Sequence, residues 1–160
     1  MPEEEFDLAI IPFHSFSELV SPEDQELALR AIRRCLKVGG RLICPLQNPR
    51  VRASAVDGAL RINGAFPIPD GLFVVSGFET LDEPTGVGDR IQFYEFFASS
   101  GDLRAKRALP MRFALLGRAG FEELVGAADF EVEALYGDYE GADYKEESSP
   151  YAIWVLRRPS

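Results

Sequence analysis

Two unbroken apolar runs near the N-terminus constrain the fold more than any other feature of this sequence. The first, Leu8 to Ile11, has no polar break, which predicts a strand over residues 7–11 that is buried on both faces. The second, Leu42 to Leu46, predicts another buried strand. We expect Pro45 to terminate this second strand, because proline has no backbone N–H to donate.

One amphipathic helix pattern separates these two runs. Ser21 is a favourable N-cap and Pro22 suits the first helical position. Gly39 and Gly40 supply the left-handed residue that we expect to end the helix. One face of the helix carries apolar side chains at helical spacing, namely Ala28, Ala31, Ile32, Cys35 and Leu36. Strand, helix and strand in this order predict a right-handed crossover between parallel strands, so the fold class is α/β.

Residues 50–113 change in character and predict an inserted, β-rich segment. Leu72 to Phe78 and Arg90 to Ala98 have the composition of two antiparallel strands, with a turn around Glu83 to Gly88. We expect this insert to lie over one end of the parallel sheet. The triplet Gly86-Val87-Gly88 begins like a dinucleotide-binding fingerprint, but no third glycine follows and the triplet precedes a strand. It therefore predicts a hairpin turn.

The last third of the chain returns to regular helices and strands. Helical spacing of apolar residues predicts a helix over 118–128, and strands are predicted at Phe130 to Tyr136 and at Tyr151 to Leu156. The polar loop between these strands has no helical pattern, so we expect the two strands to be antiparallel neighbours. A length of 160 residues suits a single domain, residues 1–160, that contains the segment 50–113 as an insert.

Charge and composition exclude several classes of function. The net charge of −9 argues against a nucleic-acid partner, which would need a basic face. No apolar stretch approaches the length of a membrane helix, and the acidic start MPEEEF is unlike a signal peptide. We therefore expect a cytoplasmic protein without a membrane partner. One histidine and two cysteines offer no metal-ligand spacing, so no metal site is predicted, and Cys35 and Cys44 are interpreted as small buried hydrophobic residues.

The ordered motifs together resemble the second half of a class I S-adenosylmethionine (SAM)-dependent methyltransferase. In that family a fourth strand leads to a helix that ends in a Lys/Arg-x-Gly-Gly turn and then to a fifth strand. A closing helix, a sixth strand and an antiparallel seventh strand follow. The similar segments here are FDLAIIPFHSF, SPEDQELALRAIRRCLKVGGRLI with QNP after it, and AADFEVEALYGDYEG…SSPYAIWVLRRP. The resemblance implies a partial Rossmann-like sheet of strands four, five, seven and six with an inserted antiparallel hairpin region.

The resemblance implies SAM as the cofactor and a small molecule as the acceptor in O- or N-methyl transfer. In the family, a Gly-rich turn after strand one and an acidic residue after strand two hold SAM. This sequence resembles the family only from strand four onward. We therefore expect the isolated chain to bind SAM weakly or not at all and to be inactive without the N-terminal half. Two smaller departures are Asp129, where the family often has a helix-ending glycine, and Pro45 in strand five.

The resemblance also implies the positions of the site residues. The loop after strand four passes near the transferred methyl group, so Phe13, His14 and Ser15 would line the pocket, with Phe13 and Ser15 on the cofactor side. His14 is the candidate catalytic residue, because an imidazole could accept a proton from a substrate hydroxyl or amine. The other interpretation is that His14 shapes the pocket or bonds a backbone carbonyl.

Four further residues are candidates for binding the methyl acceptor. Asn48 follows strand five, where a polar side chain could contact the substrate. The loop after strand six faces the substrate side in the family, and it carries Asp138, Tyr139 and Tyr144. Tyrosine and aspartate side chains can orient a polar acceptor and favour a cationic sulfonium. A solvated surface loop is the alternative interpretation of these last three residues.

Two functions from different classes remain open at this point. The chain is either the substrate-side half of a methyltransferase or a non-enzymatic, self-associating or accessory domain that binds no cofactor. In the family, strand four pairs with strand one. Without that neighbour, residues 7–11 would form a bare apolar sheet edge, which is prone to association. We therefore predict a homodimer or a partner chain that pairs with this strand.

Overall fold

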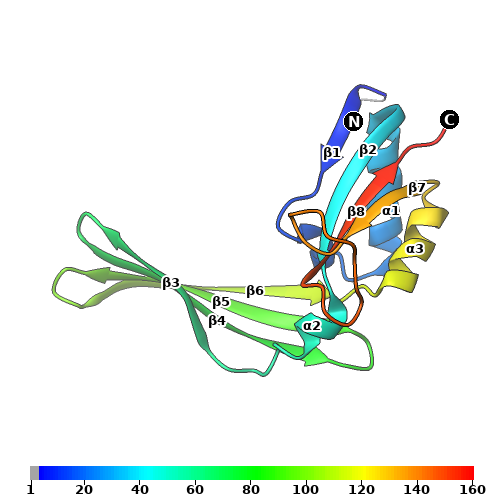
Figure 1. Cartoon of the computed structure of the whole chain (residues 1–160). Coiled ribbons are helices and arrows are strands. Elements are labelled where there is room, and N and C mark those ends of the chain that lie inside the picture. The colour runs from blue at the N-terminus through cyan, green and yellow to red at the C-terminus, as the bar shows by residue number, and fades with distance from the viewer. Residues whose placement is uncertain (1–3) are drawn as a thin grey trace. The chain divides into compact units, whose positions relative to one another are not determined.

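The structure, a computed structural model, describes residues 4–160 and divides into two compact units. Unit 1 comprises residues 4–55 and 114–160, and unit 2 comprises Val56–Phe113. Unit 1 contains the helices that pack on a mixed sheet, whereas unit 2 consists of one antiparallel sheet (Figure 1). None of the helices within residues 4–160 is long and apolar enough to cross a membrane.

The sheet of unit 1 has four strands in the order β1-β2-β8-β7. These strands are β1 (Phe6–Ile10), β2 (Leu36–Gln47), β8 (Tyr151–Arg157) and β7 (Glu131–Tyr136). Strand β1 is parallel to β2, and helix α1 (Pro22–Cys35) connects them along the chain. Strand β8 is antiparallel to both β2 and β7. The predicted α/β class, the parallel pair and the antiparallel final strands are therefore confirmed.

Helix α1 begins as the sequence predicts but ends differently. At its start the hydroxyl of Ser21 accepts a hydrogen bond from the Asp24 backbone N–H at 3.1 Å, and Pro22 occupies the first turn. The helix ends at Cys35, and the next residue is already extended and belongs to β2. The predicted glycine stop is wrong: Gly39 is left-handed, with a φ of +79°, but it lies inside β2.

Long-range contacts satisfy the backbone carbonyls at the end of α1. The guanidinium of Arg158 donates hydrogen bonds to the backbone carbonyls of Arg33, at 3.2 Å, and of Leu36. Carbonyls at a helix C-terminus have no partner within the helix and need one elsewhere. Arg158, which follows β8, supplies a side-chain partner for the Arg33 carbonyl, and the backbone N–H groups of Glu4 and Glu5 bond the Arg34 and Cys35 carbonyls at 2.9 and 3.0 Å. The helix therefore stops without a glycine, and the chain enters the sheet at once.

Strand β2 also differs from its predicted form, because it passes through Pro45 and continues to Gln47. Pro45 lies opposite Ile153 of β8. On the other side, the pairing of β1 with β2 ends with Ile10 opposite Ile43, and a further hydrogen bond joins Ile11 N–H to the Ile43 carbonyl at 3.0 Å. Pro45 therefore lies beyond the end of β1, where a missing N–H costs no ladder hydrogen bond.

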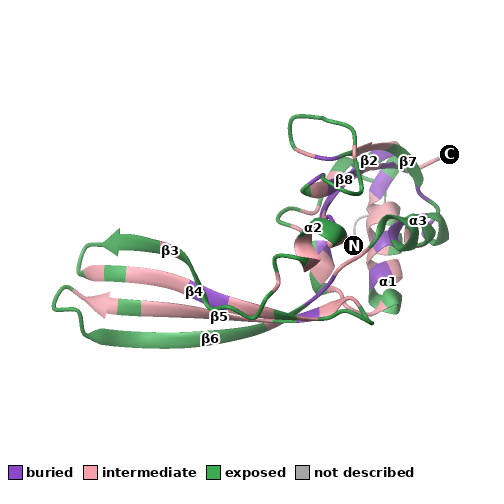
Figure 2. Cartoon of the chain, turned by 60° about the horizontal axis from the view of Figure 1, so that its bottom comes forward, coloured by how far each residue is buried: buried purple, intermediate pink, exposed green. Residues whose placement is uncertain are grey.

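The core of unit 1 lies between its sheet and two helices. Helix α1 and helix α3 (Arg118–Ala127) pack against one face of this sheet (Figure 1). The short η1 turn (Ser15–Glu18) adds Phe16, whose ring meets Phe121 edge-on at 5.6 Å. Burial is complete or nearly complete along the contact (Figure 2), at Leu29, Leu36, Leu42, Cys44, Leu46, Phe121, Val125, Ala128, Trp154 and Leu156.

Strand β1 is less buried than its apolar run predicts. Ala9 packs against the core, but Phe6, Leu8 and Ile10 on the opposite face are 47%, 47% and 57% exposed. The prediction of a strand buried on both faces is therefore wrong for the described residues. The physical reason is that β1 is an edge strand and that the face carrying Phe6, Leu8 and Ile10 has no covering layer.

The end of helix α3 confirms the special position of Asp129. This residue is left-handed, with a φ of +56°. The Asp129 N–H bonds the Gly126 carbonyl and the Phe130 N–H bonds the Val125 carbonyl, both at 3.0 Å. These two bonds form a Schellman motif, whose left-handed position is usually a glycine. Strand β7 follows immediately, within one residue of its predicted start.

Unit 2 is an antiparallel sheet in the order β3-β4-β5-β6. Its strands are β3 (Arg61–Ile68), β4 (Gly71–Asp82), β5 (Val87–Ala98) and β6 (Leu103–Ala114). The predicted hairpin is confirmed as β4 and β5, and Gly86, at a φ of +67°, lies in its turn. The sequence did not predict β3 and β6, which contain Pro67 and Pro110. Both are edge strands, where proline is tolerated.

Candidate functional site

Three loops of unit 1 meet at one edge of its sheet. The parallel strands β1 and β2 both end there, and the antiparallel β8 begins there. Helix α2 (Pro49–Ala53) follows β2 at this edge. Backbone hydrogen bonds of 3.2 Å join Asn48 N–H to the Pro150 carbonyl and Tyr151 N–H to the Gly137 carbonyl. In open α/β sheets the carboxyl ends of parallel strands are the usual place for a ligand, so we call this region the carboxyl edge.

The loop after β1 reaches the carboxyl edge in a strained conformation. Phe13 and His14 are both left-handed, with φ values of +56° and +58°. Such a conformation costs roughly 1–2 kcal/mol for each residue other than glycine. The Ser15 hydroxyl donates to the Pro12 carbonyl at 2.8 Å, and the following turn buries Phe16 in the core. The tight turn leaves the Phe13 side chain 92% exposed.

The His14 ring is held by its neighbours and lies half-buried. It stacks on the ring of Tyr151 with a centroid distance of 5.0 Å and an interplanar angle of 17°. Its Nδ1 atom is buried and has no hydrogen-bond partner among the described residues. Burial lowers the pKa of His14 below 6.5, although a hydrogen bond to the Pro45 backbone carbonyl opposes this shift. His14 is therefore neutral at neutral pH and able to accept a proton.

Asn48 binds its own chain with three hydrogen bonds. Its side chain is fully buried and accepts from the Arg50 backbone N–H at 3.2 Å, which caps α2. Its amide donates to the carbonyls of Glu146 and Ser149, both at 2.8 Å. Both amide hydrogens are thus committed to the loop between β7 and β8. The geometry assigns Asn48 the anchoring of this loop at the carboxyl edge.

The loop between β7 and β8 carries the other predicted residues. One carboxylate oxygen of Asp138 accepts from the backbone N–H groups of Glu140 and Ala142, at 2.9 and 3.0 Å, and so orders the loop. Tyr139 is 65% exposed, and its ring lies 5.2 Å from that of Tyr151. Partial burial raises the pKa of the Tyr139 phenol, and the neighbouring Tyr151 phenol adds to this increase.

Tyr144 lies apart from this group of rings. It packs against the hydrophobic core of unit 1. Burial is also the main cause that raises the pKa of its phenol, followed by the charge of Glu146. The structure therefore brings His14 and Tyr139 together through Tyr151, keeps Asn48 and Asp138 as residues that order the loop, and places Tyr144 against the core.

Sequence reasoning missed Tyr151, the central ring of this group. A signal was present: Tyr151 is the first residue of a strand predicted to be antiparallel, so it had to begin at the edge where parallel strands end. Its position opposite Gln47, the last residue of β2, shows this directly. We refer to the rings of His14, Tyr139 and Tyr151 as the three-ring cluster.

The residues present do not by themselves form a site for SAM. Phe13 is exposed, and the Ser15 hydroxyl is committed to the Pro12 carbonyl. The segment after β1 resembles the loop after the family's strand four, not the Gly-rich turn after its strand one, and it forms the strained Phe13–His14 turn.

Metal and thiol chemistry have little support in this structure. Residues 4–160 contain no group of three or more His, Cys, Asp or Glu side chains arranged to hold a metal ion. Cys44 is fully buried, and burial raises the pKa of its thiol to about 12. Cys35 is half-buried, and its thiol donates to the Ala31 carbonyl at 3.3 Å.

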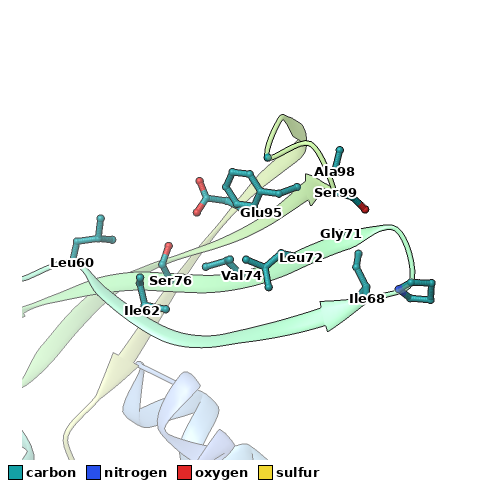
Figure 3. Close-up of a pocket in the computed structure, with 13 residues that line it drawn as sticks. Leu60, Ile62, Ile68, Gly71, Leu72, Val74, Ser76, Glu95, Ala98 and Ser99 are labelled. Carbon is teal, nitrogen blue, oxygen red and sulfur yellow. The ribbon is translucent and has the colours of Figure 1, made fainter.

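Unit 2 carries a groove of about 800 Å³ on one face of its sheet (Figure 3). Its lining is mainly apolar and includes Ile62, Leu72, Val74 and Phe97. The main charged group is Glu95, whose carboxylate is paired with the Lys106 ammonium at 2.8 Å. None of the predicted site residues lies in this groove.

Comparisons with known proteins define the fold. No family model matches this chain, and no curated protein sequence matches it. Among solved structures, the CcbJ methyltransferase from Streptomyces caelestis is similar, with a TM-score of 0.75 and 16% identity over 100% of this chain and 60% of that chain. A SAM-dependent methyltransferase from Clostridium acetobutylicum has a TM-score of 0.79 and 9% identity over 98% of this chain and 60% of its own.

A third structure extends the same result. The sugar N-methyltransferase KedS8 from Streptoalloteichus has a TM-score of 0.74 and 18% identity over 97% of this chain and 57% of its own. The chain therefore has the fold of SAM-dependent methyltransferases, as its resemblance implied. It spans no more than about 60% of the length of these structures.

Proposed function

We propose that this chain is the substrate-side part of a SAM-dependent methyltransferase that acts on a small molecule. The observation that carries this proposal is the neutral, half-buried His14 at the carboxyl edge of a sheet with the methyltransferase fold. Because KedS8 is a sugar N-methyltransferase, we propose an amine as the acceptor, with a hydroxyl as the other possible nucleophile. Asp138, Tyr139 and Tyr144 belong to the loop that would face this acceptor.

In this proposal His14 is the proton acceptor. SAM supplies a methyl group on a positively charged sulfur. With SAM bound, the acceptor nitrogen would have to give up a proton as it takes the methyl group, and a ring nitrogen of His14 would accept that proton. The lowered pKa of His14 supports this role, because a base must be unprotonated before the reaction. Phe13 and Ser15 would border the donor from this chain.

The residues that hold SAM would then come from outside this chain's described residues. We propose that β1, β2, β8 and β7 correspond to the family's strands four, five, seven and six, and that the donor half pairs with the free edge of β1. The half-exposed side chains of Phe6, Leu8 and Ile10 support this, because covering them would remove apolar surface from water. The donor half would be a partner chain or a further part of the same protein.

Two measurements test the enzymatic proposal. Calorimetric titration of the isolated chain with SAM should show no binding tighter than about millimolar, which corresponds to about 4 kcal/mol. The DNA upstream of the Met1 codon should encode, in frame or as an adjacent polypeptide, a segment with a Gly-rich turn. Its product, joined with this chain, should transfer labelled methyl groups from SAM to amino sugars, and His14→Gln should abolish most of this transfer. If the joined protein does not bind SAM, the proposal is refuted.

The exposed β1 edge also favours a second candidate, a non-enzymatic domain that associates with a second copy through this strand. Sedimentation of the isolated chain should then show a dimer. Leu8→Lys on β1 should release monomers, whereas Leu27→Lys, at an exposed position on α1, is the matched control and should not. A wild-type chain that sediments as a monomer rules out this homodimer.

A further inference from the structure

Three rings from distant parts of the sequence meet at the carboxyl edge. His14 follows β1, Tyr139 lies in the loop after β7, and Tyr151 begins β8. Tyr151 is the central member, because its ring lies 5.0 Å from that of His14 and 5.2 Å from that of Tyr139. No ring contact between His14 and Tyr139 is present, so Tyr151 is the ring that connects them.

The backbone of Tyr151 is fixed on both sides. Its N–H donates to the Gly137 carbonyl at 3.2 Å, and the strand that it begins pairs with β2 from Gln47 onward. The neighbouring Pro150 carbonyl accepts from Asn48 N–H at 3.2 Å. A ring that projects from a doubly paired strand end is more rigid than one on a free loop. Tyr151 therefore offers a fixed surface to any side chain that packs on it.

His14, in contrast, depends on outside contacts for its position. It follows another left-handed residue, and its own φ is +58°. A strained turn of this kind persists only where the surroundings hold it. The Tyr151 ring is the only aromatic ring within the described residues that stacks on the imidazole, at an interplanar angle of 17°.

We propose that Tyr151 is the positioning residue for His14 and holds its imidazole face-on at the carboxyl edge. The catalytic meaning of this role rests on the proposed function, in which His14 takes a proton from the molecule that receives the methyl group. Tyr151 touches neither donor nor acceptor in this assignment. It acts through the face of its ring, so the phenol hydroxyl is dispensable and the ring is not.

The single histidine of this chain makes the proposal directly measurable. In proton NMR spectra, the His14 imidazole signals of the wild-type chain should be shifted upfield by the Tyr151 ring current. They should also show nuclear Overhauser contacts to the Tyr151 ring protons. Tyr151→Phe should preserve the upfield shift and the pKa of His14. Tyr151→Leu should move the signals downfield and raise the pKa of His14, because the ring no longer covers the imidazole.

Two controls keep this test decisive. Tyr139→Leu removes only the outer ring and should leave the His14 signals nearly unchanged. Fluorescence of Trp154, the single tryptophan, reports whether each variant retains the core of unit 1. The proposal is overturned if the wild-type chain lacks the His14–Tyr151 contacts, or if a folded Tyr151→Leu variant keeps the wild-type shifts. The wild-type measurement alone decides the case if Tyr151→Leu does not fold.

A kinetic arm separates this inference from the proposed function. In a joined protein that transfers methyl groups, Tyr151→Leu should lower kcat by about tenfold or more with little change in KM, since a misplaced base slows proton transfer. Tyr151→Phe should retain activity. If the NMR contacts are present but no joined protein transfers methyl groups, the proposed function fails while the positioning of His14 stands. If the contacts are absent, this inference fails whatever the activity.

Discussion

Replacement of Asn48 by alanine should destabilise unit 1 strongly, because this buried side chain joins three backbone groups. The variant leaves the Ser149 carbonyl buried without its partner, at a cost of about 1–3 kcal/mol. Loss of the bond to the Glu146 carbonyl adds about 1 kcal/mol. Loss of the cap on Arg50 N–H adds about 1 kcal/mol more. The expected total is about 4 kcal/mol, a large part of the stability of an ordinary domain.

Urea unfolding followed by the fluorescence of Trp154 measures this cost. Trp154 is fully buried in unit 1 and is the only tryptophan, so its signal reports this unit specifically. Asn48→Ser is the matched control, because serine is also a good N-cap but is too short to reach both loop carbonyls. It should recover about 1 kcal/mol relative to alanine.

The result also decides between two roles for Asn48. A side chain that only contacts a substrate can be removed from the free protein with little loss of stability. If Asn48→Ala lowers the free energy of unfolding by less than about 1 kcal/mol, within the range of one ordinary hydrogen bond, the anchoring role is refuted. The loop between β7 and β8 would then need another explanation for its order.

Three further outcomes follow from the backbone and from His14. Asp129→Gly should raise the free energy of unfolding by about 1 kcal/mol, because glycine relieves the left-handed strain at a φ of +56°; an unchanged urea midpoint would contradict this. Gly40→Ala should cost about 2 kcal/mol, measured in the same way, since its Cβ would lie 2.8 Å from the Lys37 carbonyl and 3.2 Å from that of Phe6. The pKa of His14 in the folded protein lies below 6.5. The stability of the wild type, measured relative to His14→Gln, should therefore be constant above pH 6.5 and should decrease as the pH falls through the folded-state pKa. If the difference in melting temperature between the wild type and His14→Gln is the same at every pH, His14 is not buried as the structure has it.

The predictions that succeeded depend on neighbouring residues in the chain. The start of α1 follows from Ser21 and Pro22, which satisfy the first turn locally. The hairpin of β4 and β5 follows from two β-rich segments around a glycine turn. The order of apolar runs was also enough to predict the parallel pair and the antiparallel final strands.

The predictions that failed depend on residues far apart in the chain. The end of α1 depends on groups far away in the sequence, because the Arg158 guanidinium bonds the Arg33 carbonyl and the N–H groups of Glu4 and Glu5 bond the Arg34 and Cys35 carbonyls. The tolerance of Pro45 within β2 depends on where β1 stops pairing. The exposure of Phe6, Leu8 and Ile10 depends on which layers cover the sheet, a property that an apolar run cannot reveal.

The candidate site shows the same division. By itself the sequence determined that His14 follows a strand and that polar and aromatic residues fill the loop before the last strand. Only the tertiary structure decided that Asn48 holds that loop and that Tyr151 stacks on His14. Periodicity and capping act over a few residues and can be read along the chain. Hydrogen-bond partners and ring contacts between residues a hundred positions apart exist only once the sheet has brought its strand ends together.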